Sequence, residues 1–269
     1  MAGASRGVGR GLAQALGECG ATVIVTARSS ETGPRTEMRA EAVEDTARMI
    51  DLAGGRGHHY LCDHRSERAT DEMVHWVLRR FGRIDVAACA VWGGNEGFDG
   101  ERYADGTAWG TPFWRRSAEP YLALMQAGPV PALILARAVA PAMVAARSGL
   151  LALVSFGTEE SYLGDVFYDC AKAAENRLAF AFAQELGPCG VTALGLSPGS
   201  VATERAREIG RDGPGSETPL YAGRALAALA ADPHVGAYAG QVLHAGDLAR
   251  RYGFTDADGT RPERLRVGE

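Results

Sequence analysis

Short apolar segments alternate with longer helical patterns along this chain of 269 residues, and this alternation restricts the possible folds more than any other feature. The apolar runs cover 21–26, 57–62, 84–90, 150–155 and 191–197. Helical periodicity fills 37–52, 66–81, 121–144 and 166–186. Strands that alternate with helices predict βαβ units, so we expect an α/β fold with a Rossmann-like, doubly wound parallel sheet. Because no repeat or change of composition divides residues 1–269, we expect one domain.

The composition favours a protein that acts on small molecules. The net charge of −5 argues against nucleic acid or an anionic membrane surface as the main partner. The longest apolar stretch, 128–146, contains Arg137 and three prolines, which disfavours a membrane span. The five cysteines show no repeated spacing, as is typical of reduced thiols, so we expect a cytoplasmic protein.

A glycine-rich loop at the start of the chain runs directly into a helical pattern. Glycines let a backbone approach a pyrophosphate, which then binds to the free N–H groups at the helix N-terminus. A turn that merely starts the helix is the alternative. We expect the loop to bind a dinucleotide through Gly3, Ser5, Arg6, Gly7, Val8 and Gly9.

Most of the strand that should precede this loop is absent. Only Met1 and Ala2 stand before Gly3, although the first strand of a doubly wound sheet is central and has a neighbour on each side. Its loss would expose two rows of backbone hydrogen-bonding groups and leave a hole in the core. We therefore expect that the natural gene begins upstream, or that this chain is a truncated and poorly folded product.

The residues after the run 21–26 favour NADP(H) over NAD(H). A site for NAD is expected to place Asp or Glu here for the ribose 2′-hydroxyl, and this chain has Ala27. Arg28, together with Arg6, is placed to bind a 2′-phosphate through charge-assisted hydrogen bonds. The alternative is that both arginines are solvated surface residues.

Lys172 is the only lysine among 28 basic residues, and it follows Tyr168 by four positions. Both side chains therefore project from one face of the predicted helix 166–186. A tyrosine that transfers protons near neutrality needs its pKa lowered from about 10, and a neighbouring ammonium group favours the phenolate. We expect Tyr168 to transfer a proton and Lys172 to activate it; a pair of surface residues is the alternative.

Ser155 ends the run 150–155, thirteen residues before Tyr168. It should lie at the carboxyl end of a strand beside the helix, where its hydroxyl can hold a substrate carbonyl. A turn-forming role is the alternative, and Thr158 is the substitute if the strand ends later.

These segments resemble the classical short-chain dehydrogenase/reductase family over essentially the whole chain. GASRGVG is similar to the family's Thr-Gly-x-x-x-Gly-x-Gly, YDCAK to its Tyr-x-x-x-Lys, and SPGSVATE to its Pro-Gly segment. VWGG at 91–94, SYLGDVFYDCAK and the tail AGDLARRYGFTDADG resemble a bacterial branch related to dehydrogenase/reductase member 1.

The resemblance implies a role for each matching residue. Ser155 would polarise a carbonyl, Tyr168 would transfer the proton, and Lys172 would activate Tyr168 and bind the nicotinamide ribose. Asp63 would contact adenine. The Pro-Gly segment would contact nicotinamide and pyrophosphate through Pro198, Gly199, Val201 and Thr203. Family members also imply a homodimer or homotetramer.

Other positions depart from the family pattern. Residues 89–92 (CAVW) replace Asn-Asn-Ala-Gly, and Gly128 stands where the catalytic Asn is expected. Pro129 and Pro131 then follow inside the predicted helix 121–144, where an interior proline costs about 3 kcal/mol. Together with the absent strand, these departures favour a weak enzyme or a degenerated copy.

We expect no metal site, and the loop aromatics remain open to two interpretations. A strand would point its histidines and cysteine to alternate faces, which disfavours one shared ion for His58, His59, Cys62 and His64. The irregular segments 92–114 and 203–219 should lie over the ligand crevice. The aromatics of 92–114 either anchor that loop or line a pocket for an apolar substrate.

The sequence therefore predicts an oxidoreductase that transfers a hydride between NADP(H) and an apolar carbonyl or alcohol. One alternative is a catalytically weak or inactive NADP(H)-binding protein that acts as a sensor or scaffold. Another is an epimerase or dehydratase of nucleotide sugars, although the spacing between Gly3 and Gly7 fits the dehydrogenase pattern better.

Overall fold

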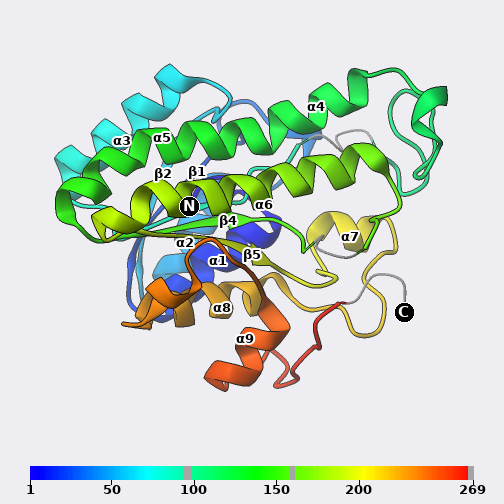
Figure 1. Ribbon diagram of the computed structural model, residues 1–269. Coiled ribbons are helices and arrows are strands. Elements are labelled where there is room, and N and C mark those ends of the chain that lie inside the picture. Colours follow the sequence, from blue (N-terminus) through cyan, green and yellow to red (C-terminus); the bar gives the residue numbers. More distant parts are fainter. Residues whose placement is uncertain (94–97, 158–160, 266–269) are drawn as a thin grey trace.

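The computed structural model describes residues 1–93, 98–157 and 161–265 and shows the expected doubly wound α/β fold (Figure 1). All strand pairs are parallel. The strands are β1 (Thr22–Ala27), β2 (Arg56–Leu61), β3 (Val86–Cys89), β4 (Leu150–Val154), β5 (Thr192–Ser197) and β6 (Val242–His244). The strand order is β2-β1 on one side and β3-β4-β5-β6 on the other.

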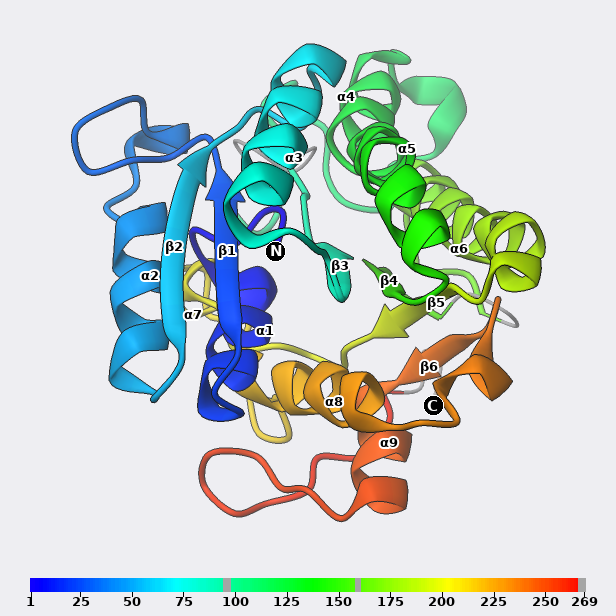
Figure 2. The same ribbon diagram turned by 90° about the vertical axis from the view of Figure 1, so that its left-hand side faces the viewer.

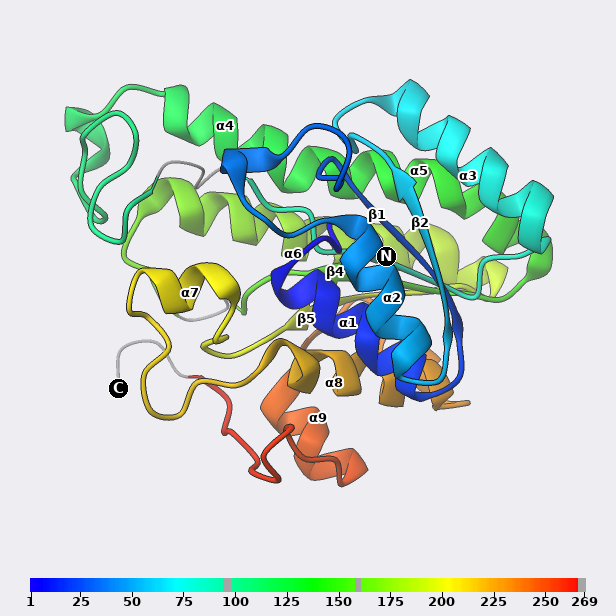
Figure 3. The ribbon, with the colours of Figure 1, turned by 180° about the vertical axis from the view of Figure 1, so that it is seen from behind.

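Helices cover both faces of the sheet (Figures 2 and 3). One face carries α3 (Glu67–Phe81), α4 (Glu119–Ala127), α5 (Pro129–Ala146) and α6 (Val166–Leu186). The other face carries α1 (Gly7–Glu18), α2 (Val43–Leu52) and α8 (Pro219–Ala231). The remaining helices are α7 (Glu204–Glu208) and α9 (Ala245–Tyr252). Short 3₁₀ helices cover Thr36–Met38, Phe113–Arg115, Gly187–Cys189 and Val235–Tyr238.

Met1 and Ala2 join the two parts of the sheet. The amide of Ala2 donates to the Ala88 carbonyl at 2.9 Å, and Thr26 donates to the Met1 carbonyl at 2.9 Å. Within the described residues, Ala2 alone bridges both β1 and β3. These two residues therefore take the position of the central strand, and the N-terminus lies between β1 and β3 (Figure 2).

An apolar cavity of about 440 Å³ continues from Met1 between the facing edges of β1 and β3. The hole that the absent strand predicts in the core is therefore present. The Met1 ammonium donates to the Ile24 carbonyl at 2.7 Å, and burial lowers the pKa of this amino group to about 6. The cavity lining includes Val23, Ile24, Val74, Val77, Val86, Ala87, Leu135 and Val139.

The predicted helix 121–144 is two helices, because Gly128 leaves helical geometry with φ −131° and ψ −85°. Pro129 and Pro131 consequently lie in the first turn of α5, where a proline removes no helical hydrogen bond. The expectation that they weaken a helix interior is therefore wrong; Pro141 alone lies inside α5.

By length and composition alone, residues 119–146 are long and apolar enough to cross a membrane; an 18-residue window within them has a mean hydropathy of 1.7. The core helix of a soluble protein passes the same test. Here α5 packs between α3 and α6.

The predicted helix 37–52 begins only at Val43. Glu37 and Met38 adopt positive φ values of 55° and 54°, which an α-helix does not allow. The chain from 31 to 42 instead forms a loop beside the carboxyl end of β1.

We expect a chain extended before Met1 by about six alternating apolar and β-branched residues to melt at least about 5 °C higher, because the added strand would pair with both exposed edges and fill the cavity. Differential scanning calorimetry measures the change. An extension of equal length made of Gly and Ser is the control and should leave the melting temperature nearly unchanged. Equal melting of both extended chains and the original would contradict this description of the cavity.

Candidate active site

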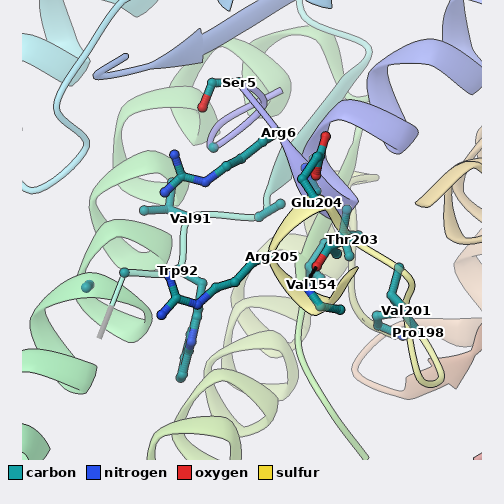
Figure 4. Close-up of a pocket in the computed structure, with 18 of the residues that line it drawn as sticks. Ser5, Arg6, Val91, Trp92, Val154, Pro198, Val201, Thr203, Glu204 and Arg205 are labelled. Carbon is teal, nitrogen blue, oxygen red and sulfur yellow. Dashed lines mark hydrogen bonds between the residues drawn. The ribbon is translucent and has the colours of Figure 1, made fainter. Parts of the chain in front are cut away.

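One cavity of about 680 Å³ brings together the residues that the sequence predicts for the site. Figure 4 shows part of its wall. It lies at the carboxyl ends of the strands, where doubly wound sheets bind ligands. Its volume is typical of small-molecule pockets. The predicted residues on its wall are Gly3, Ser5, Arg6, Gly7, Val8, Gly9, Arg28, Asp63, Ser155, Tyr168, Lys172, Pro198, Gly199, Val201 and Thr203.

The conformation of the glycine loop requires residues without a Cβ atom at two positions. Gly3 has φ +75°, and a Cβ there would lie 2.6 Å from the Val91 nitrogen. A Cβ on Gly9 would lie 2.2 Å from the Gly3 carbonyl oxygen. The loop can therefore fold closely over the sheet edge and present the N-terminus of α1 to the cavity.

An acidic side chain already binds at this helix N-terminus. The Gly7 amide donates to Oε2 of Glu204 at 2.8 Å, and Arg10 lies 3.3 Å from Oε1 of the same carboxylate. The preference of the site for a negative group is thus visible within the chain itself. Glu204 begins α7, directly after Thr203, whose hydroxyl caps that helix by accepting from the Ala206 amide.

Cationic side chains dominate the cavity wall. The cationic lining residues are Arg6, Arg28, Arg65, Lys172, Arg205 and Arg211, whereas the acidic lining residues are only Asp63 and Glu204. This excess of positive charge favours a ligand that carries several negative charges.

Arg6 and Arg205 reach into the same part of the cavity from the glycine loop and from α7 (Figure 4). Both pair with Glu37, at 3.5 Å and 2.8 Å. Arg205 is not among the residues that the sequence predicts for the site, because nothing in an irregular segment indicates where an arginine side chain points.

Asp63 lies at the predicted adenine end with its carboxylate bound to a neighbour. Arg65 donates to it through Nη2 at 2.7 Å and through Nε at 3.0 Å. These contacts hold the pKa of Asp63 below its usual value. An adenine contact would therefore have to share this carboxylate with Arg65.

Asp165 fixes the start of α6, the helix that carries Tyr168. Its carboxylate caps the helix by accepting from the amides of Phe167 and Tyr168 at 3.0 and 3.1 Å. It also accepts from Arg116 at 2.5 Å, and both side chains of this ion pair are fully buried.

Arg116 joins the loop 98–117 to this helix cap. Its guanidinium lies between the rings of Tyr103 and Phe167, 4.7 and 4.5 Å from their centroids. The loop over the cavity and the start of the helix are thus one packed unit.

Ser155 follows β4, as its place in the apolar run predicts, and its side chain is buried. Its hydroxyl donates to the backbone carbonyl of Lys172 at 3.2 Å. Thr158, the alternative to Ser155, lies outside the described residues.

Lys172 is buried on α6 between an acidic and an aromatic side chain. Its ammonium donates to Oε2 of Glu175 at 2.9 Å and lies 3.6 Å from the centroid of the Trp92 ring. Glu175 is not among the residues that the sequence predicts for the site. Its position one turn after the only lysine could have indicated an ion pair with Lys172.

Tyr168 lies on the cavity wall near Lys172, with Trp92 and Trp109 packed at 5.4 and 5.3 Å between ring centroids. Burial raises the pKa of Tyr168 above its ordinary value; Lys172 lowers this pKa in part, and Glu175 raises it further. The lysine therefore acts in the expected direction, but in the chain by itself burial outweighs it.

The loop aromatics divide between the two expected roles. Trp92, Phe98 and Trp109 line the cavity, while Tyr103 packs behind Phe98 at 4.9 Å. The remaining rings, Phe113 and Trp114, are exposed.

The residues considered for a metal do not form a site in the described part of the chain, where no group of three or more His, Cys, Asp and Glu side chains could hold an ion. His64 is buried, and its Nε2 lies 2.7 Å from the Thr26 hydroxyl. His58 instead packs on Phe81.

Comparison with known proteins agrees with this geometry. A family model described as short chain dehydrogenase matches residues 1–213. The chain is 33% identical over 275 residues to dehydrogenase/reductase SDR family member 1 of Mus musculus, covering 96% of this chain and 82% of that protein.

Two solved structures resemble the whole fold. A short chain dehydrogenase from Mycobacterium thermoresistibile has a TM-score of 0.80 at 20% identity, covering 99% of this chain and 92% of that one. A metagenomic short-chain oxidoreductase in complex with NADP has a TM-score of 0.65 at 26% identity, covering 86% and 89%.

We expect Arg116→Met to lower the free energy of unfolding by about 3 kcal/mol, because it leaves the buried Asp165 carboxylate without its cation. For a chain of this size the melting temperature should fall by roughly 6 to 12 °C. Arg115→Met, at the exposed neighbouring position, is the matched control and should change the free energy by less than about 0.5 kcal/mol. Similar melting of both variants would show that the ion pair does not hold the loop to α6.

Proposed function

The chain belongs to the short chain dehydrogenase family, and from this membership we propose that it is an oxidoreductase that uses NADP(H) to interconvert a carbonyl and an alcohol. One observation carries the proposal. Ser155, Tyr168 and Lys172 line the same cavity as the glycine loop and the N-terminus of α1. A hydride donor bound by the loop would therefore share one space with the three candidate catalytic side chains.

The cavity wall fits a dinucleotide in shape and charge. Gly3 and Gly9 leave room that a Cβ would fill, and the cationic side chains favour a polyanion. The N-terminus of α1 would bind the pyrophosphate. The other contacts would come from Ser5 and Val8 of the loop, and, on the nicotinamide side, from Pro198, Gly199, Val201 and Thr203.

When bound, the nicotinamide supplies or accepts the hydride. Ser155 would release the Lys172 carbonyl and donate its hydroxyl to the substrate oxygen. Tyr168 would donate a proton to that oxygen during reduction and remove it during oxidation. Lys172 stabilises the phenolate form through its positive charge.

The preference for NADP(H) over NAD(H) rests on charge at the end of β1. Ala27 provides no carboxylate for a 2′-hydroxyl, and Arg28 and Arg6 are on the cavity wall. The solved relative with NADP bound supports the same choice. A 2′-phosphate would take over the contact that Arg6 now makes with Glu37.

An apolar substrate fits the space near Tyr168. The walls there include Trp92, Phe98, Trp109, Phe156 and Leu163. Such a surface favours a carbonyl or alcohol attached to an apolar group.

We also propose a homodimer or homotetramer in the cytoplasm. Exposed apolar side chains on α4, α5 and α6 are typical of a surface that a second subunit covers. They are Leu122, Val130, Leu133 and Phe180. Unpaired cysteines agree with a reducing compartment.

One observation favours the alternative of an NADP(H)-binding protein without turnover. The Lys172 ammonium is engaged by Glu175, and the pKa of Tyr168 lies above its ordinary value. Tight binding of NADPH without its oxidation across a panel of aldehydes, ketones and quinones would establish this alternative.

Tyr168→Phe should lower turnover at least about 100-fold, because it removes the proton donor while keeping the ring. The dissociation constant for NADPH should change less than about twofold, since a phenol hydroxyl supplies little of the cofactor affinity. Steady-state oxidation of NADPH and fluorescence titration measure the two quantities. Unchanged turnover would exclude this role for the phenol.

Arg28→Ala should weaken NADPH about tenfold or more and leave NADH nearly unaffected, because one charge-assisted contact to a phosphate contributes about 1.5 to 3 kcal/mol. Arg35→Ala, in the loop that follows, is the control. Equal losses for both cofactors would contradict the assignment of the 2′-phosphate site.

A further inference from the structure

Glu175 is a buried carboxylate at the centre of the site that the Tyr-x-x-x-Lys motif does not include. It lies one turn after Lys172 on α6, and its side chain is 4% exposed. The buried apolar side chains of α6 include Ala171, Ala179 and Ala183. A charge in such surroundings is costly unless it is paired, so Glu175 must act through the groups that it contacts.

Its contacts include two of the candidate catalytic residues. Oε2 accepts from the Lys172 ammonium at 2.9 Å. Burial raises the pKa of the Glu175 carboxyl above its ordinary value, while Lys172 and, to a smaller extent, Ser155 lower it. The Trp92 ring covers another side of the ammonium at 3.6 Å. The lysine charge is thus held between a carboxylate and the face of an indole, both geometries that stabilise a cation.

Gly128 makes room for this arrangement. A Cβ at this position would lie 2.6 Å from Cζ3 of Trp92 and 3.1 Å from Oε1 of Glu175. A side chain at Gly128 would therefore displace both Trp92 and Glu175. Trp92, Gly128 and Glu175 therefore fit together as one set around Lys172.

We propose that Glu175 is a positioning residue that holds the Lys172 ammonium against Trp92 and thereby sets the pH at which Tyr168 exchanges its proton. This role rests on the proposed function, because it assumes that Tyr168 transfers the proton. The proposal gives a role to two departures from the family pattern, Trp92 and Gly128. Without it, Gly128 is only the loss of the Asn that the family pattern has.

The sign of the effect follows from the charges around Tyr168. The ionisable groups that act on it are Lys172 and Glu175 from α6 and Tyr103 from the loop 98–117; Cys89 of β3 also faces the Lys172–Glu175 pair. Lys172 favours the phenolate and Glu175 opposes it. Removing the carboxylate charge should therefore make Tyr168 more acidic.

Glu175→Gln keeps the shape of the side chain and removes its charge. In the cofactor-free protein, the absorbance of tyrosinate is titrated against pH in two chains that differ only by Tyr168→Phe. The difference between the two titrations is the contribution of Tyr168. We expect its titration midpoint to fall by about one pH unit in Glu175→Gln. The acidic limb of the kcat profile for alcohol oxidation should move to lower pH by a similar amount, because oxidation needs the phenolate.

Glu185→Gln is the matched control, since it removes the same charge from an exposed position on α6. It should leave both midpoints in place. Glu175→Asp, which keeps the charge, should titrate close to the original chain. If Glu175→Gln folds and neither midpoint moves, the carboxylate is only structural and the proposal is wrong.

A second variant covers the case in which Glu175→Gln does not fold. Gly128→Ala should push Trp92 and Glu175 aside and shift the Tyr168 midpoint in the same direction, whereas an unmoved midpoint would overturn the proposal. The absorbance titration needs no turnover. Absence of turnover in the original chain would therefore refute the proposed function, while the titration would still decide the role of Glu175.

Discussion

The hydrogen bonds of Met1 and Ala2 to both neighbouring strands hold the two parts of the sheet in register. Gly3 follows immediately, so these bonds also determine where the glycine loop meets Val91 and where α1 begins. The rest of the cavity is built from strand ends on both sides of this junction. The hydrogen bonds of Met1 and Ala2 thus position the glycine loop relative to the ends of β3 and β4, and a cavity lies directly beside them.

Two buried ion pairs give α6 its place beside that junction. Arg116–Asp165 fixes the start of the helix and the loop above it, and Lys172–Glu175 fixes the charge about two turns further along. Both pairs have aromatic rings as neighbours, which exclude water from the charges. Removing one member of such a pair is expensive, because its partner stays buried and charged. Loss of either pair should therefore weaken the packing of α6, whose buried apolar side chains are mostly alanines.

The sequence predicts the sheet well because apolar runs record burial directly. The runs for β1 to β5 match the observed strands to within two residues at each end. β6 has three residues, too few for a pattern, and the break at Gly128 and the late start of α2 depend on backbone angles that composition does not reveal. The residues of the motifs line one cavity, because the spacing within each motif reflects the chemical groups that a shared site requires. Arg205 was missed because charged residues are usually on the surface and only packing shows where its side chain points, whereas the closeness of Glu175 to the only lysine was a signal in the sequence.

Glu37 and Glu204 occupy the arginines and the helix end that a phosphate-bearing ligand would use. Binding of such a ligand is therefore an exchange of one anion for another, with the internal carboxylates returned to solvent. The net charge around Arg6, Arg205 and the N-terminus of α1 therefore changes by less than the full charge of the ligand. The affinity should accordingly depend only weakly on salt concentration, and the loop 31–42 and α7 should move together as the exchange occurs.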